Sequence, residues 1–221
     1  MKNIIFLSAL FVFAGGQEFE DTLEGKCKSK LLSNVPTDWI TMSDGCTQKM
    51  KEQVKEEFQA AMTYMAMGAH FAKDVVNRPG FSKMFFKAAS EEREHGMKIM
   101  DYLIMRGGLL KDFSNIIGQP RPTNNKTAWK SGFEALSDAL ALESHVTRKI
   151  TALVKACEDS PAIGIQLRND YHLVDYLTGD FLEEQLKGQR EIAGRVSTLG
   201  KMMDDHGPLG EFLYDKKLLE E

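Results

Sequence analysis

The sequence has little of what marks several protein classes. Its 221 residues include 3 cysteines and 6 prolines, too few for a disulfide-dense scaffold or for a proline-rich low-complexity chain. It also lacks an excess of positive charge, because 28 Lys and Arg stand against 32 Asp and Glu. These charges are scattered along the chain rather than clustered. We therefore expect no nucleic-acid partner.

No stretch is apolar over the roughly 20 residues that a membrane-spanning helix needs. The most apolar segment, residues 4–14, follows a single lysine and leads to the small residues Gly15 and Gly16. This pattern is typical of a secretory signal peptide over residues 1–16, cleaved before Gln17. We therefore expect a secreted protein without a membrane span, with an N-terminal extension over residues 17–44 and a folded domain over residues 45–221.

Beyond Cys46 the chain also lacks the alternating pattern of β-strands. It shows four long stretches in which apolar residues recur at spacings of three and four, which predicts an all-α four-helix bundle. The expected inward positions are Met50, Val54, Glu57, Ala61, Tyr64, Gly68 and Phe71; Phe81, Phe85, Ala88, Glu92, His95, Ile99 and Tyr102; Trp129, Phe133, Leu136, Leu140, Glu143, Thr147, Ile150, Val154 and Cys157; and Val174, Thr178, Phe181, Gln185, Gly188 and Ile192.

Each of the four apolar stretches is interrupted by a polar residue. Three of the interruptions are the carboxylates Glu57, Glu92 and Glu143, and an ionised carboxylate in a bundle core costs several kcal/mol unless a cation neutralises it. No Lys or Arg occupies these inward positions, so a metal ion is the expected cation. Carboxylates with the single imidazole of His95 suit iron or manganese.

The connections allow these residues to meet. Glu57 lies 16 residues before residue 73, and Glu92 lies 14 residues after residue 78, so a tight turn over residues 73–78 brings them to one level. The long connection over residues 107–126 can extend along the whole bundle, which gives an up, down, crossover, down, up topology.

This order brings Cys46 and Cys157 to the same end and predicts a disulfide between them. Cys27 is left over, and we favour a bridge to another subunit over a free thiol.

At the level of motifs, the chain resembles a ferritin subunit of the heavy, ferroxidase-bearing kind from about residue 38 onward. The resemblance rests on Glu-Glu-Arg-Glu-His at residues 91–95, Arg-Gly-Gly at residues 106–108 and Asp-Phe-Leu-Glu-Glu-Gln at residues 180–185. Residues 67–81, the cysteines and the expected signal peptide make it most similar to the secreted ferritin heavy-chain homologues of insects.

The resemblance implies specific roles for these residues. It assigns Glu57, Glu92 and His95 to one iron ion and Glu143 with Gln185 to a second, with Glu92 bridging the two. Tyr64 then takes the place of a tyrosine beside the centre that forms a hydrogen bond and donates an electron. Glu91 and Glu94 match acids that nucleate mineral, whereas Met97 replaces a third. A short fifth helix is expected over residues 210–219, in which Phe212, Leu213, Tyr214 and Leu218 would dock at a symmetry axis.

The implied function is iron storage. Fe(II) would be oxidised by dioxygen at an intra-subunit di-iron centre and delivered to a mineral core. The core would lie inside a hollow shell of roughly two dozen subunits, either of this chain alone or with a light-chain-type partner. The polar stretch between the second and third helices also carries an N-glycosylation sequon at Asn125.

Two other functions remain open at the level of sequence. A di-iron carboxylate oxidase could act on an organic substrate, although di-iron four-helix bundles commonly carry Glu-x-x-His on two helices. Here only residues 92–95 match that motif, and no histidine stands at the required spacing from Gln185. A non-catalytic shell or iron-carrier subunit is the other alternative, in which the inward polar residues would only stabilise the fold.

Overall fold

The computed structural model describes residues 42–106, 118–158 and 169–221. The chain divides into two units, Met1–Thr37 and Asp38–Glu221, and everything below concerns the second. The expected signal peptide, most of the N-terminal extension and Cys27 lie outside the described residues.

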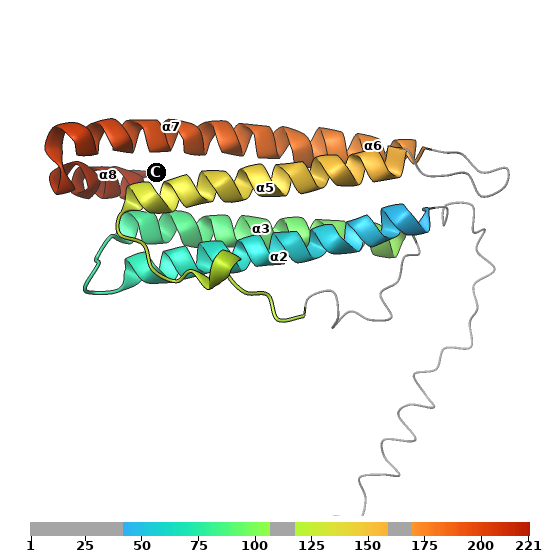
Figure 1. Cartoon of the computed structure of the whole chain (residues 1–221), viewed down its shortest axis with the longest axis horizontal. Helices are drawn as coiled ribbons and strands as arrows, with labels where there is room; N and C mark the ends of the chain where they lie inside the picture. Colours follow the sequence, from blue (N-terminus) through green and yellow to red (C-terminus); the bar gives the residue numbers. More distant parts are fainter. Residues whose placement is uncertain (1–41, 107–117, 159–168) are drawn as a thin grey trace, which may run out of the picture. The chain divides into compact units, whose positions relative to one another are not determined.

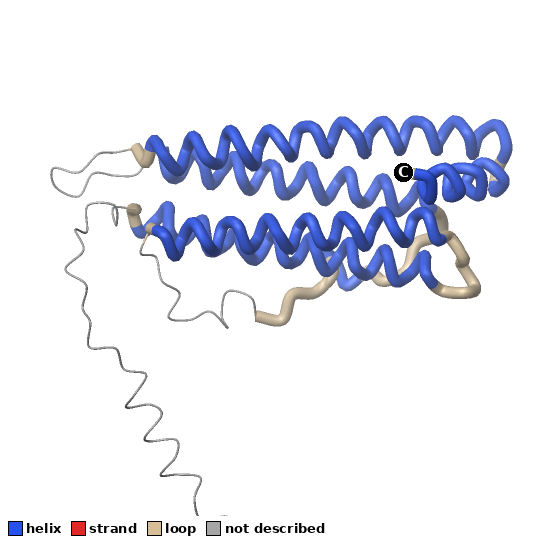
Figure 2. The backbone as a smooth tube through the Cα atoms, turned by 180° about the vertical axis from the view of Figure 1, so that it is seen from behind, coloured by secondary structure: helices blue, strands red, loops and turns tan. Residues whose placement is uncertain are grey.

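The described residues form helices and no strand (Figure 2). The long helices are α2 (Asp44–Ala72), α3 (Pro79–Met105) and α5 (Gly132–Glu158). The fourth rod joins α6 (Tyr171–Tyr176), the π-helical segment η2 (Leu177–Leu182) and α7 (Glu183–His206). The shorter helices are η1 (Thr123–Asn125) and α8 (Pro208–Glu220). None of the described helices is long and apolar enough to cross a membrane.

The helices have the crossover order expected from the sequence (Figure 1). A turn over residues 73–78 makes α2 and α3 an antiparallel pair, and α5 and α7 form a second antiparallel pair. Cys46 in the first turn of α2 forms a disulfide with Cys157 in the last turn of α5. The start of α2 therefore lies beside the end of α5, so the third long helix runs antiparallel to the first.

Most of the expected inward side chains of α2, α3 and α5 are buried, but Phe133 is not. It is 37% exposed, so its assignment to the core was wrong. The expectation assumed one helical period from Trp129 onward, whereas α5 begins only at Gly132. Trp129 is buried ahead of the helix, where its indole N–H donates to Asp138 at 2.9 Å.

The fourth rod corrects a second expectation. Thr178 is exposed and Val174 only half-buried, whereas Leu173 and Leu177 are buried together with Phe181. The cause is the π-helical segment Leu177–Leu182, whose turns hold more residues than those of an α-helix. The inward positions are therefore spaced by four residues from Leu173 to Gln185, which a pattern of threes and fours does not reproduce.

Two carboxylates of α8 hold the helix against the bundle. Asp215 accepts hydrogen bonds from the backbone N–H groups of Gly80 at 2.8 Å and Phe81 at 3.0 Å, and Glu211 accepts from Gly132 N–H at 2.9 Å. The first turns of α3 and α5 thus obtain acceptors from α8. Tyr214 is also buried, so part of the expected docking surface packs into the subunit's own core.

The expected docking set of α8 is thus divided. Leu218 is buried together with Tyr214, whereas Phe212 and Leu213 are 43% and 46% exposed. Only the latter two are accessible for contact with another subunit.

Candidate metal centre

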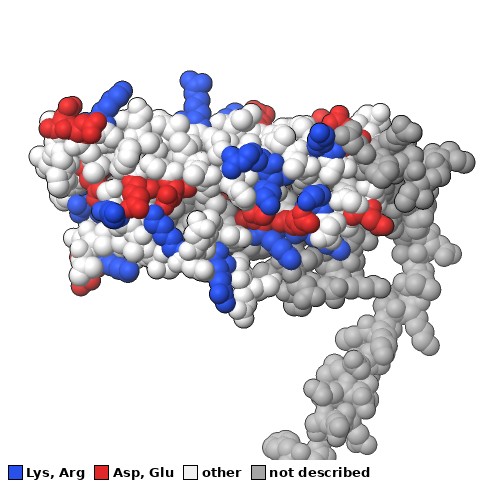
Figure 3. Space-filling view, in the orientation of Figure 1, with Lys and Arg blue, Asp and Glu red and all other residues white. Residues whose placement is uncertain are grey.

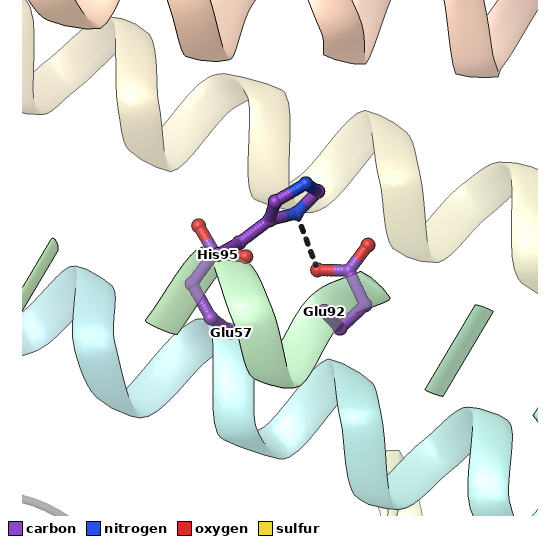
Figure 4. A group of neighbouring side chains, drawn as sticks. All are labelled: Glu57, Glu92 and His95. Atoms are coloured by element: carbon purple, nitrogen blue, oxygen red, sulfur yellow. Dashed lines mark ion pairs between the residues drawn. The ribbon is translucent and has the colours of Figure 1, made fainter. Parts of the chain in front are cut away.

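Three side chains with metal-binding atoms converge inside the bundle. Glu57 comes from α2, and Glu92 and His95 come from adjacent turns of α3 (Figure 4). One ligand atom from each lies within 4.8 Å of the others, and all three residues are buried. The glutamate and histidine of α3 are three residues apart, so they lie on the same helix face. The antiparallel pairing of α2 and α3 then brings Glu57 to the same level.

The polar atoms at this point lack the partners that buried polar groups normally have. Among the described residues, Glu57 Oε2, Glu92 Oε2 and His95 Nδ1 have no hydrogen-bond partner, and the last two lie 3.6 Å apart. Most buried polar atoms in proteins are hydrogen-bonded, and isolated carboxylate oxygens are costly to bury. Two oxygens and one imidazole nitrogen left free in one place fit the coordination of a divalent ion such as Fe(II).

The other expected ligands lie on the opposite helix pair. Glu143 is buried on α5, where it accepts a short hydrogen bond from the hydroxyl of Tyr64 on α2. Gln185 is buried at the start of α7, and its side-chain oxygen accepts from Thr147 Oγ1 at 2.9 Å. All six residues expected at the centre are therefore buried. Glu57, Glu92 and His95 form one cluster, Tyr64 binds Glu143, and Gln185 binds Thr147.

Burial and mutual repulsion keep these carboxylates from ionising easily. Burial raises the pKa of Glu92 to about 8, and the charge of Glu143 acts in the same direction. Burial also raises the pKa of Glu57 well above its usual range, helped by the charge of Glu92, and it raises the pKa of Glu143. The metal-free site therefore holds protons that a bound cation must displace.

We expect the metal-free protein to become less stable as the pH rises from about 5 to 8. Burial raises the pKa of Glu92 from an ordinary 4.5 to about 8 in the folded chain, so between these values the folded state holds a proton that the unfolded state has lost. The stabilisation is complete below the pKa that Glu92 has in the unfolded chain, and it is lost as the pH rises through the pKa that Glu92 has in the folded chain. Denaturant unfolding across this range measures it, and saturating Mn(II) should remove the decline by binding the carboxylates as anions. A metal-free protein whose stability rises over this window would contradict the assigned protonation.

A groove between α3 and α7 leads to the centre. It has a volume of about 1230 Å³, and Tyr64, Glu92, His95, Glu143 and Gln185 are among its lining residues. Of the 26 lining residues, 13 are Asp, Glu, Lys or Arg. A route with so many charges suits an ion better than an apolar organic molecule.

Sequence reasoning missed two residues that support the centre. Glu184, at the mouth of the groove, lies 3.3 Å from Nε2 of His95, and Gln53 donates to Glu57 Oε1 at 2.8 Å. A carboxylate on the outer nitrogen of a metal-binding histidine is a common way to orient the ring. Gln53 could have been found from the sequence, because it lies one helical turn before Glu57.

The remaining predicted residues lie at the surface. Glu91 and Glu94 are exposed on α3, and Glu91 pairs with Lys87 at 3.4 Å. Asn125 is exposed in η1, where a glycan would meet no buried side chain. On the face shown in Figure 3, the described Lys and Arg residues are interspersed with Asp and Glu rather than gathered into one basic patch.

Comparisons with known proteins bear on the family and the fold. The model of the ferritin-like domain of the ferritin family matches residues 47–202. The chain belongs to the ferritin family. It is 57% identical to a ferritin heavy chain of Trichoplusia ni over 84% of each chain, and 53% identical to one of Drosophila melanogaster over 87% of this chain and 90% of the other. The crystal structure of Trichoplusia ni secreted ferritin matches with a TM-score of 0.80 and 55% identity, covering 88% of this chain and 98% of that one. The family and the bundle fold expected from the sequence are thereby confirmed.

Proposed function

We propose that this ferritin subunit is a ferroxidase, which oxidises Fe(II) with dioxygen before the iron is stored. The observation that carries the proposal is the set of three unpartnered buried ligand atoms on Glu57, Glu92 and His95. A subunit that only formed a shell would gain stability from apolar residues at these positions, because burying unpaired carboxylates is costly. The presence of carboxylates at these buried positions is explained if they bind a cation.

We propose that two Fe(II) ions bind side by side. Glu57, Glu92 and His95 would hold the first, while Glu143 and Gln185 would hold the second, with Glu92 between them. His95 would bind through its unpartnered Nδ1, because its Nε2 faces the carboxylate of Glu184 at 3.3 Å. The second position has a neutral amide in place of a carboxylate or histidine, so it holds iron more weakly and releases the oxidised product more easily.

The protein's part in the reaction is to hold two electron donors beside one dioxygen molecule. Each Fe(II) gives one electron, and with two protons from solvent the oxygen is reduced to hydrogen peroxide. The hydroxyl of Tyr64 donates a hydrogen bond to Glu143, which would orient that carboxylate toward the second position. We also assign to Tyr64 the donation of an electron, as the resemblance implies.

The test is rapid mixing of Fe(II) with oxygenated protein, followed by absorbance of Fe(III). We expect fast oxidation by the assembled protein and slow oxidation when Zn(II) is added first, because Zn(II) binds such ligands more tightly than Fe(II) and is not redox-active. Equal rates with and without Zn(II) would show that oxidation does not occur at this centre, and would favour a non-catalytic shell subunit.

We further propose that the chain is secreted and assembles into a shell of roughly two dozen subunits, together with a light-chain-type subunit. Residues 1–16 would be removed, residues 17–44 would form an extension carrying Cys27, and residues 45–221 would form the bundle. Cys27 would link subunits, Asn125 would carry a glycan, and Glu91 with Glu94 would nucleate mineral on the shell's inner surface.

Native mass spectrometry of the secreted protein tests the assembly. We expect a mass near that of two dozen subunits, and a second subunit type would appear as a second mass after denaturation. Glycosidase treatment should lower the mass of this subunit, and an Asn125→Gln variant should be insensitive to it. A small oligomer would contradict the proposed shell and leave the bundle with another role.

A further inference from the structure

A row of aromatic rings connects the metal centre to one end of the bundle. The ring of His95 lies 5.9 Å from that of Phe181, which lies 5.4 Å from the ring of Tyr176. Tyr176 in turn stacks on Tyr102, with ring centroids 4.8 Å apart and planes within 16° of parallel. The row runs through η2, because the π-helical segment brings Phe181 inward within five residues of Tyr176. Three consecutive short ring contacts therefore link a metal ligand to two tyrosines.

The last tyrosine of the row has a base beside its hydroxyl. Tyr102 is 5% exposed, and its oxygen lies 2.8 Å from Nδ1 of His172. Arg106 donates to the same oxygen at 2.9 Å, while its guanidinium also binds both carboxylate oxygens of Asp170 at 2.9 and 2.7 Å. Arginine only donates, so the Tyr102 oxygen accepts that bond, and the phenol donates its proton to Nδ1 when His172 is in the tautomer that carries its own proton on Nε2. His172 is exposed and can exchange that proton with water.

We propose that Tyr102, paired with His172, is an electron donor to the metal centre through Tyr176 and Phe181. A phenol gives up an electron easily only if its proton leaves at the same time, and a neutral imidazole in hydrogen-bond contact is a suitable acceptor near neutral pH. The inference rests on the proposed ferroxidase function and adds a second tyrosine to it. Unlike Tyr64, this tyrosine lies outside the ligand cluster, at the far end of the row of rings.

The step balances as a reduction of hydrogen peroxide, the product of dioxygen and two Fe(II). One Fe(II) at the centre and Tyr102 each give one electron, the oxygen–oxygen bond breaks, and two protons from solvent complete two water molecules. The hydroxyl proton of Tyr102 moves to Nδ1 of His172, which leaves a neutral tyrosyl radical. A second Fe(II), arriving in the groove that Tyr176 lines, returns the electron, and the proton returns from His172. In total, two Fe(II), one hydrogen peroxide and two protons give two Fe(III) and two water molecules.

A purely structural role for this cluster predicts different behaviour. The Arg106–Asp170 pair already ties the end of α3 to the start of α6, so the hydroxyl of Tyr102 is not needed for that connection. Tyr102→Phe preserves the stacked ring and removes only the ionisable group. His172→Gln preserves a hydrogen-bond acceptor for the phenol but not a base. Tyr214→Phe is the matched control, because Tyr214 is also buried, but its ring lies tilted against Phe81, with centroids 5.9 Å apart, and is not part of this row.

The experiment is freeze-quench electron paramagnetic resonance on the assembled protein. Each variant is loaded anaerobically with Fe(II), mixed with hydrogen peroxide and frozen, and the remaining peroxide is measured in parallel. We expect a tyrosyl radical signal in the wild-type protein and in Tyr214→Phe, loss of that signal component in Tyr102→Phe and a weaker signal in His172→Gln. More peroxide should remain in Tyr102→Phe and His172→Gln than in Tyr214→Phe.

The outcomes separate the two proposals. If the wild-type protein oxidises Fe(II) in the Zn(II)-sensitive way but its radical signal is absent or equal to that of Tyr102→Phe, the relay is wrong and the ferroxidase assignment stands. If Zn(II) has no effect on oxidation, the ferroxidase assignment itself fails. If Tyr102→Phe does not assemble, the relay is tested with His172→Gln instead. That variant should assemble because His172 is exposed. A radical signal in it as strong as in the wild-type protein would overturn the relay.

Discussion

Replacing Glu92 with glutamine is expected to slow Fe(II) oxidation by about 100-fold or more, because even residues that only support metal ligands commonly account for 10- to 100-fold in affinity or activity. Glu92 contributes one of the three unpartnered atoms, and it is the carboxylate placed between the two proposed iron positions. Glutamine has nearly the same volume, so the packing of α3 against α2 is preserved. The measurement is the initial rate of Fe(III) formation after rapid mixing with oxygenated buffer.

The same substitution should stabilise the metal-free protein. With a pKa of about 8, Glu92 has to take up a proton on folding at neutral pH, and a neutral amide avoids this at a gain on the order of a few kcal/mol. Slower oxidation together with a higher unfolding midpoint is the signature of a residue retained for binding a cation rather than for the fold.

The control is Glu52→Gln on α2, whose side chain is 44% exposed and paired with Lys49 at 2.6 Å. We expect it to change neither the oxidation rate nor the stability by a measurable amount, since exposed ion pairs contribute little. If Glu92→Gln oxidises iron as fast as the wild-type protein does, the reacting iron is bound elsewhere and the proposed centre is wrong.

The residues of this centre were predictable because burial of charge is unusual in a bundle. Glu57, Glu92 and Glu143 fall at regular spacings among apolar side chains, and one turn length and one crossover are enough to bring them to the same level. The cysteine pair follows from the same topology. Such predictions rest on the periodicity of long straight helices, because the periodicity identifies the buried face without any information on how individual side chains pack.

The prediction failed where the backbone departs from that periodicity. The π-helical segment moves Thr178 to the surface and Leu177 into the core, and no local residue pattern announces the change. It failed also where a residue's partner is distant in sequence. Asp215 and Glu211 look like surface acids of a terminal helix, yet they cap α3 and α5. The available clue lay at the start of α3: Arg78, the residue before this helix, provides no side-chain cap, so the first N–H groups of the helix need another acceptor.

The metal centre lowers the stability of the bundle when no cation is bound, so other interactions have to stabilise the fold. Three buried carboxylates with raised pKa values weaken the metal-free bundle, and they lie along the boundary between the α2–α3 pair and the α5–α7 pair. Whatever holds the two helix pairs together has to offset that repulsion. The disulfide between α2 and α5 is a covalent cross-link between the two helix pairs.

Replacing Cys46 and Cys157 together with serine is therefore expected to lower the unfolding free energy of the subunit by about 4 to 5 kcal/mol, because a bridge that closes a loop of this length restricts the unfolded chain by that much. The bridged cysteines are 111 residues apart in sequence. For a chain of this size the loss corresponds to a decrease in Tm of roughly 10 to 20 °C. Differential scanning calorimetry of the metal-free protein measures it.

The third cysteine provides the matched control. Cys27→Ser removes a thiol without opening the bridge, so it should leave the Tm of the subunit unchanged, while a covalent dimer on non-reducing gels should disappear if Cys27 links subunits. Metal binding should restore part of the stability lost in the double serine variant, because a cation held by side chains from α2, α3 and α5 connects the same two helix pairs. A double variant with an unchanged Tm would mean that packing alone overcomes the repulsion of the three carboxylates.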